Sequence, residues 1–266
     1  MPPRPTEPVR YLFVDGGSLA KTMQAFSRQF WSDKKLEIDF VALGEGFKKK
    51  FYYDAYPVAR EDQVPDLEAK IEAHDFLIDR VGTQPGWHAY AGEARYRRRQ
   101  GGLEQKMVDI MIAVDMMRSA FDGVMDECTL LASDLDFKPL LDELVRQGMT
   151  VHLWYEPRAT SRDLIRSADH ARPFDLDTAY RLLTPASRAQ VPALPDLSEH
   201  PDPVPAPDHP LIEEGSFHDG PWRLYEKPNG FLLHYGSPER RANYVALGTD
   251  KAFLFAYLAH HGWQRL

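Results

Sequence analysis

Short apolar runs that alternate with helix-forming segments constrain the fold of this chain most strongly. Residues 9–14, 51–53, 129–132 and 151–155 have the length and composition of buried strands, and helical patterns separate them. Strands that alternate with helices in this way imply a parallel sheet covered by helices on both faces. We therefore expect an open α/β sheet over the first two thirds of the chain.

The helices of this expected sheet start at recognisable positions. Ser18 can cap a helix that runs to about residue 31, and a second helix begins near Pro65. Others are expected over residues 104–121 and just after Asp136. Residues 82–102 are rich in Gly, Arg and aromatic side chains, and part of this segment is expected to be a strand or hairpin.

Composition divides the chain into three parts. Residues 1–183 form the main domain, and residues 184–214 read as a semi-rigid Pro-rich linker without helix or central strand. Residues 215–266 form a small α+β module with the expected order β-β-β-α. About 50 residues is small for independent stability, so we expect this module to dock on the main domain, dimerise or bind a protein partner.

Several functional classes are excluded or disfavoured by composition. The single cysteine, Cys128, cannot form an internal disulfide and suits a reducing cytoplasm. No apolar stretch approaches the roughly 20 residues that span a bilayer, so no membrane role is expected. The net charge of -8 counts weakly against a nucleic-acid partner, but net charge is an average over surfaces of different sign.

Four aspartates follow or interrupt the apolar runs. Asp15 ends the first run, Asp134 and Asp136 follow the run at 129–132, and Asp109 lies near the start of an apolar helix. Carboxylates at the C-terminal ends of parallel strands project into the crevice where open α/β sheets bind ligands. Together they would repel one another unless a hard cation such as Mg²⁺ or Mn²⁺ is bound. The chemistry to expect is metal-assisted attack on a phosphate.

Each of these aspartates also has an alternative interpretation. The segment from Asp15 to Ser18 could be an ordinary turn, and Asp134 or Asp136 could serve only as a helix cap. The residues around Asp109 are apolar on every face, which predicts a buried helix, so Asp109 could instead form a buried pair with Lys or Arg. Asp115 points to a different face of that helix and is expected to have a structural partner.

A basic cluster directly precedes the Asp109 helix, with tyrosines interleaved. Its members are Arg95, Arg97, Arg98, Arg99 and Lys106. Arginine and aromatic side chains together suit single-stranded nucleic acid through phosphate contact and base stacking. The alternative is a solvated loop. We expect these five residues and Ser18 to contact substrate, with Lys106 on a phosphate.

The ordered set of motifs resembles the NYN domain, a branch of the PIN-like ribonuclease superfamily, over roughly residues 9–170. The matching residues are Tyr11 to Gly16, Lys106, Val108, Asp109, Ala113, Asp115, Leu130 to Asp134, Asp136, Phe137, Pro139, Leu140 and Gly148. The resemblance implies a Rossmann-like three-layer α/β/α fold with a mainly parallel sheet. It also implies a metal-dependent endoribonuclease that acts on single-stranded or structured RNA and leaves a 5′-phosphate and a 3′-hydroxyl.

The resemblance assigns metal binding to Asp15, Asp109, Asp134 and Asp136, with two departures from the family pattern nearby. The family commonly has Asn where Ser18 stands and Gly at the position of Ser133. Neither departure removes a carboxylate.

Other functions remain open from the sequence. A catalytically inactive RNA-binding or scaffold protein could keep the same fold. A phosphatase with an Asp-x-Asp pair would need that pair on its first strand, whereas Asp134 and Asp136 come late in this chain. An adhesion-type metal site would need export, which nothing in the sequence indicates.

Overall fold

The computed structural model describes most of the chain in two compact units. The described residues are 7–56, 65–92, 95–96, 103–104, 106–195, 198–200, 209–217, 220–227, 230–236, 241–247 and 250–265. The first unit comprises residues 1–25 and 36–183, and the second comprises residues 26–35 and 184–266.

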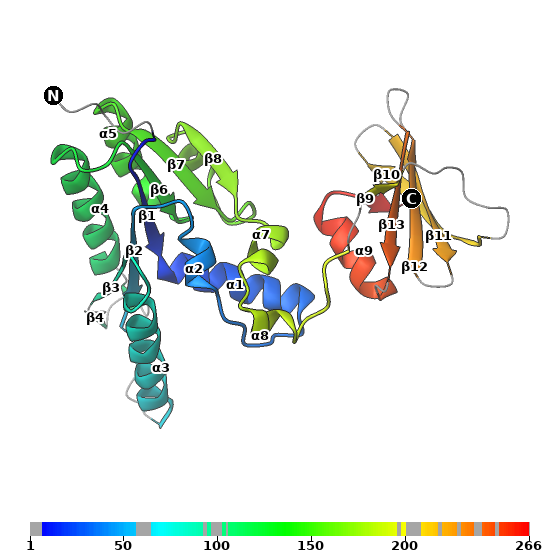
Figure 1. Cartoon of the computed structure of the whole chain (residues 1–266), viewed down its shortest axis with the longest axis horizontal. Coiled ribbons are helices and arrows are strands. Elements are labelled where there is room, and N and C mark those ends of the chain that lie inside the picture. The colour runs from blue at the N-terminus through cyan, green and yellow to red at the C-terminus, as the bar shows by residue number, and fades with distance from the viewer. Residues whose placement is uncertain are drawn as a thin grey trace. The chain divides into compact units, whose positions relative to one another are not determined.

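A six-stranded sheet forms the centre of the first unit (Figure 1), with the strand order β3-β2-β1-β6-β7-β8. All neighbouring strands in this sheet pair in parallel. The strands are β1 (Arg10–Asp15), β2 (Lys49–Ala55), β3 (Trp87–Gly92), β6 (Glu127–Leu131), β7 (Thr150–Tyr155) and β8 (His170–Pro173). The α/β fold class predicted from the alternating pattern is confirmed.

Helices connect these strands and cover the sheet. They are α1 (Gly16–Phe30), α2 (Phe40–Leu43), α3 (Pro65–Gly82), α4 (Lys106–Phe121), α5 (Lys138–Arg146), α6 (Arg162–Ile165) and α7 (Leu176–Arg181), with a 3-10 turn η1 (Leu135–Phe137) before α5. The core on one face packs α4 and α5 side chains against Phe13, Leu130 and Leu153. These three residues lie side by side in register on adjacent strands, so the opposite face of the sheet carries their sequence neighbours.

Two details of this unit differ from expectation. The sheet has a further edge strand, β8, which pairs with β7. The sequence did not indicate it because all four of its residues are exposed. Helix α4 is not buried on every side: Ile110 is 62% exposed and Val114 is 57% exposed. A helix in an outer layer needs only its inner stripe for packing.

A two-stranded hairpin leads into α4, as the prediction for residues 82–102 allowed. Its strands are β4 (Arg95–Tyr96) and β5 (Leu103–Glu104). A Cβ added at Gly92 would lie 2.8 Å from Cγ2 of Val108. The end of β3 therefore lies directly against the first turns of α4, one residue from Asp109.

The second unit contains an antiparallel sheet with the order β14-β10-β11-β12-β13-β9. Its elements are α8 (Pro185–Arg188), β9 (Ser198–His200), β10 (Leu211–Phe217), β11 (Gly220–Lys227), β12 (Gly230–Gly236), β13 (Arg241–Leu247), α9 (Lys251–His260) and β14 (Gln264–Arg265). The predicted three strands and helix correspond to β11, β12, β13 and α9, and β9, β10 and β14 are additional.

The Pro-rich stretch is not free of helix. Helix α8 starts at Pro185, where the fixed backbone angle of proline suits a first helical position, and Thr184 caps it. Residues 201–208, the centre of the expected linker, lie outside the described residues. None of the helices in the described ranges combines the length and apolar character that a membrane span requires.

Candidate active site

Asp15 lies at the C-terminal end of β1, where α1 begins. It is 7% exposed, and both of its carboxylate oxygens accept hydrogen bonds from Ser18, from the backbone N at 3.2 Å and from Oγ at 2.7 Å. Helix α1 starts at Gly16, so Asp15 rather than Ser18 accepts the first-turn N–H groups. Burial raises the pKa of Asp15, and the hydrogen bonds from Ser18 oppose that rise.

Gly16 accommodates a protein side chain rather than a ligand. A Cβ at this position would lie 2.6 Å from the hydroxyl of Tyr52 and 2.8 Å from the carbonyl oxygen of Tyr53. Glycine at this position therefore lets the start of α1 approach β2 closely.

The two serines that depart from the family pattern belong to one chain of hydrogen bonds. The backbone N of Ser133 donates to Oγ of Ser18 at 3.3 Å, and Ser18 donates in turn to Asp15. The hydroxyl of Ser133 accepts from the backbone N of Glu156 at 3.1 Å. This chain ties together the ends of β1, β6 and β7, and it fixes the orientation of the Asp15 carboxylate.

Asp134 and Asp136 lie just beyond β6, on the surface. The side chain of Asp134 accepts from the backbone N of Asp136 at 3.0 Å and caps η1. This is the capping role that the sequence offered as an alternative. Both side chains are exposed, so capping by one oxygen of Asp134 leaves the other oxygen and the whole of Asp136 available to solvent or a ligand.

Asp109 lies in the first turn of α4 and interacts with the other three aspartates through space. Burial raises its pKa to about 6, and the negative charges of Asp15, Asp134 and Asp136 add to the rise. Asp109 makes no hydrogen bond or ion pair with the described side chains. The side chain of Lys106, which was expected to contact a substrate phosphate and which shares a helix with Asp109, lies outside that set. Asp115, by contrast, accepts a 2.7 Å hydrogen bond from Tyr53, as expected of a structural residue.

The four predicted carboxylates therefore form one electrostatic cluster at the C-terminal edge of the sheet. Their donor atoms are all oxygens, which suit a hard divalent cation in charge and chemistry. Within the described ranges, however, no group of three or more His, Cys, Asp or Glu side chains is arranged so that it could hold a metal ion. The set fits such a cation in charge, but not in side-chain geometry.

A fifth carboxylate, Asp54, lies beside Asp15 at the end of β2. Burial raises the pKa of Asp54, His74 and hydrogen bonds lower it, and the charge of Asp15 raises it further. Its oxygens accept from the backbone N of Ala55 at 2.9 Å and the hydroxyl of Tyr52 at 3.3 Å. The sequence placed Asp54 at a strand end, the same signal that identified Asp15, but gave it no role.

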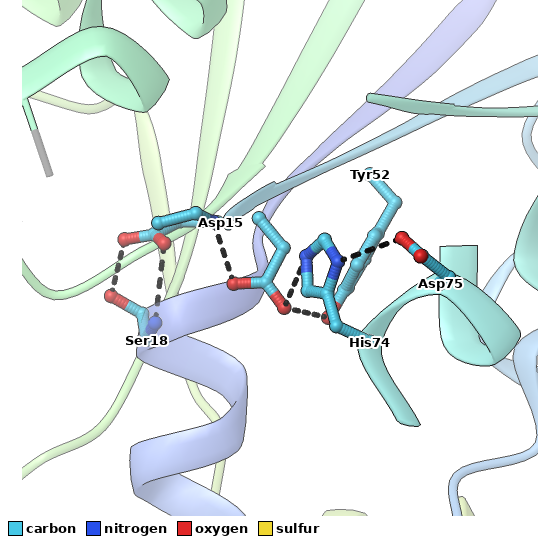
Figure 2. Close-up of polar contacts among 7 residues, drawn as sticks. Asp15, Ser18, Tyr52, His74 and Asp75 are labelled. Carbon is cyan, nitrogen blue, oxygen red and sulfur yellow. Dashed lines mark hydrogen bonds and ion pairs between the residues drawn. The ribbon is translucent and has the colours of Figure 1, made fainter. Parts of the chain in front are cut away.

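His74 reaches this fifth carboxylate from α3. Figure 2 shows Asp15 bonded to Ser18, with Tyr52 and His74 grouped beyond it. Nε2 of His74 lies 4.0 Å from Asp54, and Nδ1 lies 3.8 Å from Asp75. Both ring nitrogens are buried without a hydrogen bond from the described residues, so the contacts of His74 are electrostatic.

Lys21 is the described cation that faces this cluster. It is exposed on α1, and its charge lowers the pKa of both Asp15 and Asp109. Sequence reasoning missed Lys21, although it lies one helical turn from Ser18. Of the predicted basic cluster, Arg97, Arg98 and Arg99 lie outside the described residues, as does the side chain of Arg95, whose backbone forms β4.

Comparison with known proteins identifies the family. The family model for the NYN domain matches residues 11–176, more than half of the chain. A solved structure of a protein of unknown function from Vibrio parahaemolyticus RIMD 2210633 is similar, with 19% identity and a TM-score of 0.44. The similarity covers 68% of this chain and 100% of that one. No curated protein matches the sequence. The likeness to that solved Vibrio structure is too weak to carry an argument about function.

The NYN family lies within the PIN-like nuclease superfamily, and its members are generally nucleases that act on RNA. The match spans β1 through the start of α7 and includes all four predicted aspartates. The protein is a member of the NYN domain family.

Proposed function

We propose that this protein is a metal-dependent endoribonuclease that hydrolyses RNA phosphodiester bonds at the cluster of Asp15, Asp109, Asp134 and Asp136. The observation that carries the proposal is the placement of these four aspartates, within a domain that matches the NYN family, close enough for the charges of Asp15, Asp134 and Asp136 to act on Asp109. Four acids from three separate segments that repel one another at the edge of the sheet are costly without a counter-cation. In a nuclease family, a divalent cation is the expected counter-charge.

When bound, Mg²⁺ or Mn²⁺ supplies Lewis-acid chemistry, since it makes water more acidic and offsets charge on phosphate oxygens. The protein's own groups position the reactants. Ser18 orients the carboxylate of Asp15 through its 2.7 Å hydrogen bond. Lys21 is our candidate for the RNA phosphate contact closest to the aspartates, and Lys106 and the arginines of residues 95–99 guide the strand towards them.

A cleavage assay with purified full-length protein tests the proposal. Asp134→Asn keeps an acceptor for the capping contact with Asp136 but removes one negative charge from the cluster. We expect wild-type protein to cut a pool of RNAs with Mn²⁺ and to stop when EDTA is added. Asp134→Asn should lose cleavage. Asp163→Asn is a matched control, because Asp163 is also an exposed aspartate at the start of a short helix, α6.

Cation binding needs a readout that does not depend on turnover. A ligand that binds only the folded protein raises its melting temperature with ligand concentration. Mn²⁺ should raise the melting temperature of wild type and Asp163→Asn, and raise it less for Asp134→Asn. If Asp134→Asn cuts RNA at the wild-type rate with Mn²⁺ present, the assignment of the site is wrong.

The second candidate is a catalytically inactive RNA-binding or scaffold protein with the same fold. One observation favours it: the described carboxylates are not arranged to hold a metal ion. This candidate predicts RNA binding that EDTA and Asp134→Asn leave unchanged, without cleavage by the wild-type protein. RNA recovered after crosslinking to Asp134→Asn would identify the bound sequences under either candidate.

A further inference from the structure

A second potential binding site lies on the face of the large sheet away from α4 and α5. A cavity of about 250 Å³ is formed there by residues of β1, β6, β7 and β8 and by the loop after α2. Its lining residues are Arg10, Phe47, Thr129, His152, Trp154, His170, Ala171 and Arg172. No acidic residue is among them, although the protein as a whole carries a net charge of -8.

The strand order leaves this part of the sheet open. Thr129, His152 and His170 lie side by side on β6, β7 and β8. They share the face opposite Leu130 and Leu153, against which α4 and α5 pack. The residues of β8 are exposed, so a ligand can reach this end of the row from solvent.

Two guanidinium groups in the cavity make cation–π contacts with aromatic rings. Cζ of Arg10 lies 6.0 Å from the ring centroid of Phe47, and Cζ of Arg172 lies 5.5 Å from that of Trp154. Neither side chain makes a hydrogen bond or an ion pair within the described part of the chain. Their N–H donors match the oxygens of phosphate.

The remaining walls are flat rings. His152 and His170 stack with their centroids 4.7 Å apart, and Phe47 meets Trp154 edge-on at 5.9 Å. Nε2 of His152 lies 3.3 Å from the carboxylate of Glu127, without hydrogen-bond geometry. Glu127 is also the cross-strand neighbour of Arg10 in the register of β1 and β6, but these described side chains form no ion pair with each other, and Glu127 forms none with Arg172. Aromatic walls of this kind favour a flat heterocycle by stacking.

We propose that this cavity binds one nucleotide unit, with its phosphate on Arg10 and Arg172 and its base against the aromatic walls. The volume of about 250 Å³ lies just below the roughly 300–1,000 Å³ of ordinary ligand pockets, so a single nucleotide would remain partly exposed and a dinucleotide cofactor does not fit. The nucleotide comes either from solution or from an RNA strand. The site does not depend on the proposed nuclease activity, because it uses none of the clustered aspartates.

Calorimetric titration of full-length protein in EDTA tests this site, because EDTA prevents metal-dependent turnover. The probes are AMP, adenosine, inorganic phosphate and a 2′-O-methylated oligonucleotide of about ten nucleotides. We expect AMP to bind more tightly than either adenosine or phosphate alone. Arg172→Gln should weaken AMP binding about tenfold or more, as for the loss of a charge-assisted hydrogen bond. Arg172 is exposed, so the fold should persist.

The matched control is Arg166→Gln, an exposed arginine at the end of α6 that does not line the cavity. It should bind AMP as wild type does, and so should Asp134→Asn, which separates this site from the aspartate cluster. Tighter binding of the oligonucleotide than of AMP, also weakened by Arg172→Gln, identifies an RNA strand as the source. Equal binding identifies a free nucleotide.

Three results would overturn the proposal. The first is no detectable AMP binding, and the second is AMP binding that Arg172→Gln leaves unchanged. The third is inorganic phosphate binding as tightly as AMP, which would leave the aromatic walls without a role.

Discussion

Asp109→Asn should stabilise the metal-free protein at neutral pH while it removes RNA cleavage. Burial, followed by the charges of Asp15, Asp134 and Asp136, raises the pKa of Asp109 from 3.8 to about 6. A carboxyl whose pKa is higher in the folded protein than in the unfolded chain prefers to be protonated when folded. The contribution of Asp109 to stability is therefore most favourable below about pH 3.8 and is lost as the pH rises through about 6.

The size of this effect follows from the same shift. Moving the pKa from 3.8 to about 6 corresponds to about 3 kcal/mol. Asp109 is only partly buried, and solvent screens part of its repulsion, so we expect about 1–2 kcal/mol in practice. Asn carries no charge at any pH, and Asp109 makes no hydrogen bond with described residues that the substitution would break.

Urea unfolding in EDTA measures this gain. At about pH 4 wild type and Asp109→Asn should have similar stability, and above about pH 7 the variant should be more stable by about 1–2 kcal/mol. Asp115→Asn is the control on the same helix. Because Asp115 accepts a hydrogen bond from Tyr53, its replacement should give no gain at either pH.

The reasoning about Asp109 fails if Asp109→Asn is equal to or less stable than wild type above about pH 7. Added Mn²⁺ provides a second check. Mn²⁺ should stabilise wild type more than Asp109→Asn, because only wild type keeps all four carboxylates whose repulsion the cation offsets. The difference in unfolding free energy between the two proteins should therefore shrink.

Three further changes test the surroundings of the cluster. Ser18→Ala should lower the cleavage rate about tenfold, since it removes a charge-assisted hydrogen bond to Asp15, whereas Ser18→Asn, which restores the family residue, should recover most of the rate. Lys21→Ala should raise the KM for RNA with little change in kcat. It should also reduce the slope of log affinity against log salt concentration by about 0.7 for single-stranded RNA. An unchanged slope would exclude the phosphate contact. Gly16→Ala should cost about 1–3 kcal/mol in urea unfolding, because its Cβ would lie 2.6 Å from the Tyr52 hydroxyl, and a variant of wild-type stability would contradict the close approach.

The sequence by itself determined the alternation of strands and helices and the positions of the four aspartates along it. Both are local patterns. A short apolar run predicts a buried strand wherever it lies, and an aspartate directly after it must lie at the end of that strand. Asp15 and Asp134 were found in this way, and Asp54 carried the same signal without being used.

Only the tertiary structure decided which residues lie next to one another. The strand order β3-β2-β1-β6-β7-β8 places Asp54 next to Asp15 and the helix of Asp109 within reach of Asp134. Strand β8 could not be recognised because it is exposed and has no apolar run. The exposed stripe of α4 could not be foreseen either, because an apolar residue does not reveal whether another layer covers it.

The same reason explains Lys21 and the cavity between Arg10 and Arg172. Asp109, on which Lys21 acts, and most of the residues that line the cavity are far apart in the chain, so their interactions depend on distances that only the packed sheet sets. Local physics determined the strands and helices with an apolar pattern, while the order in which the strands assemble determined which charges meet.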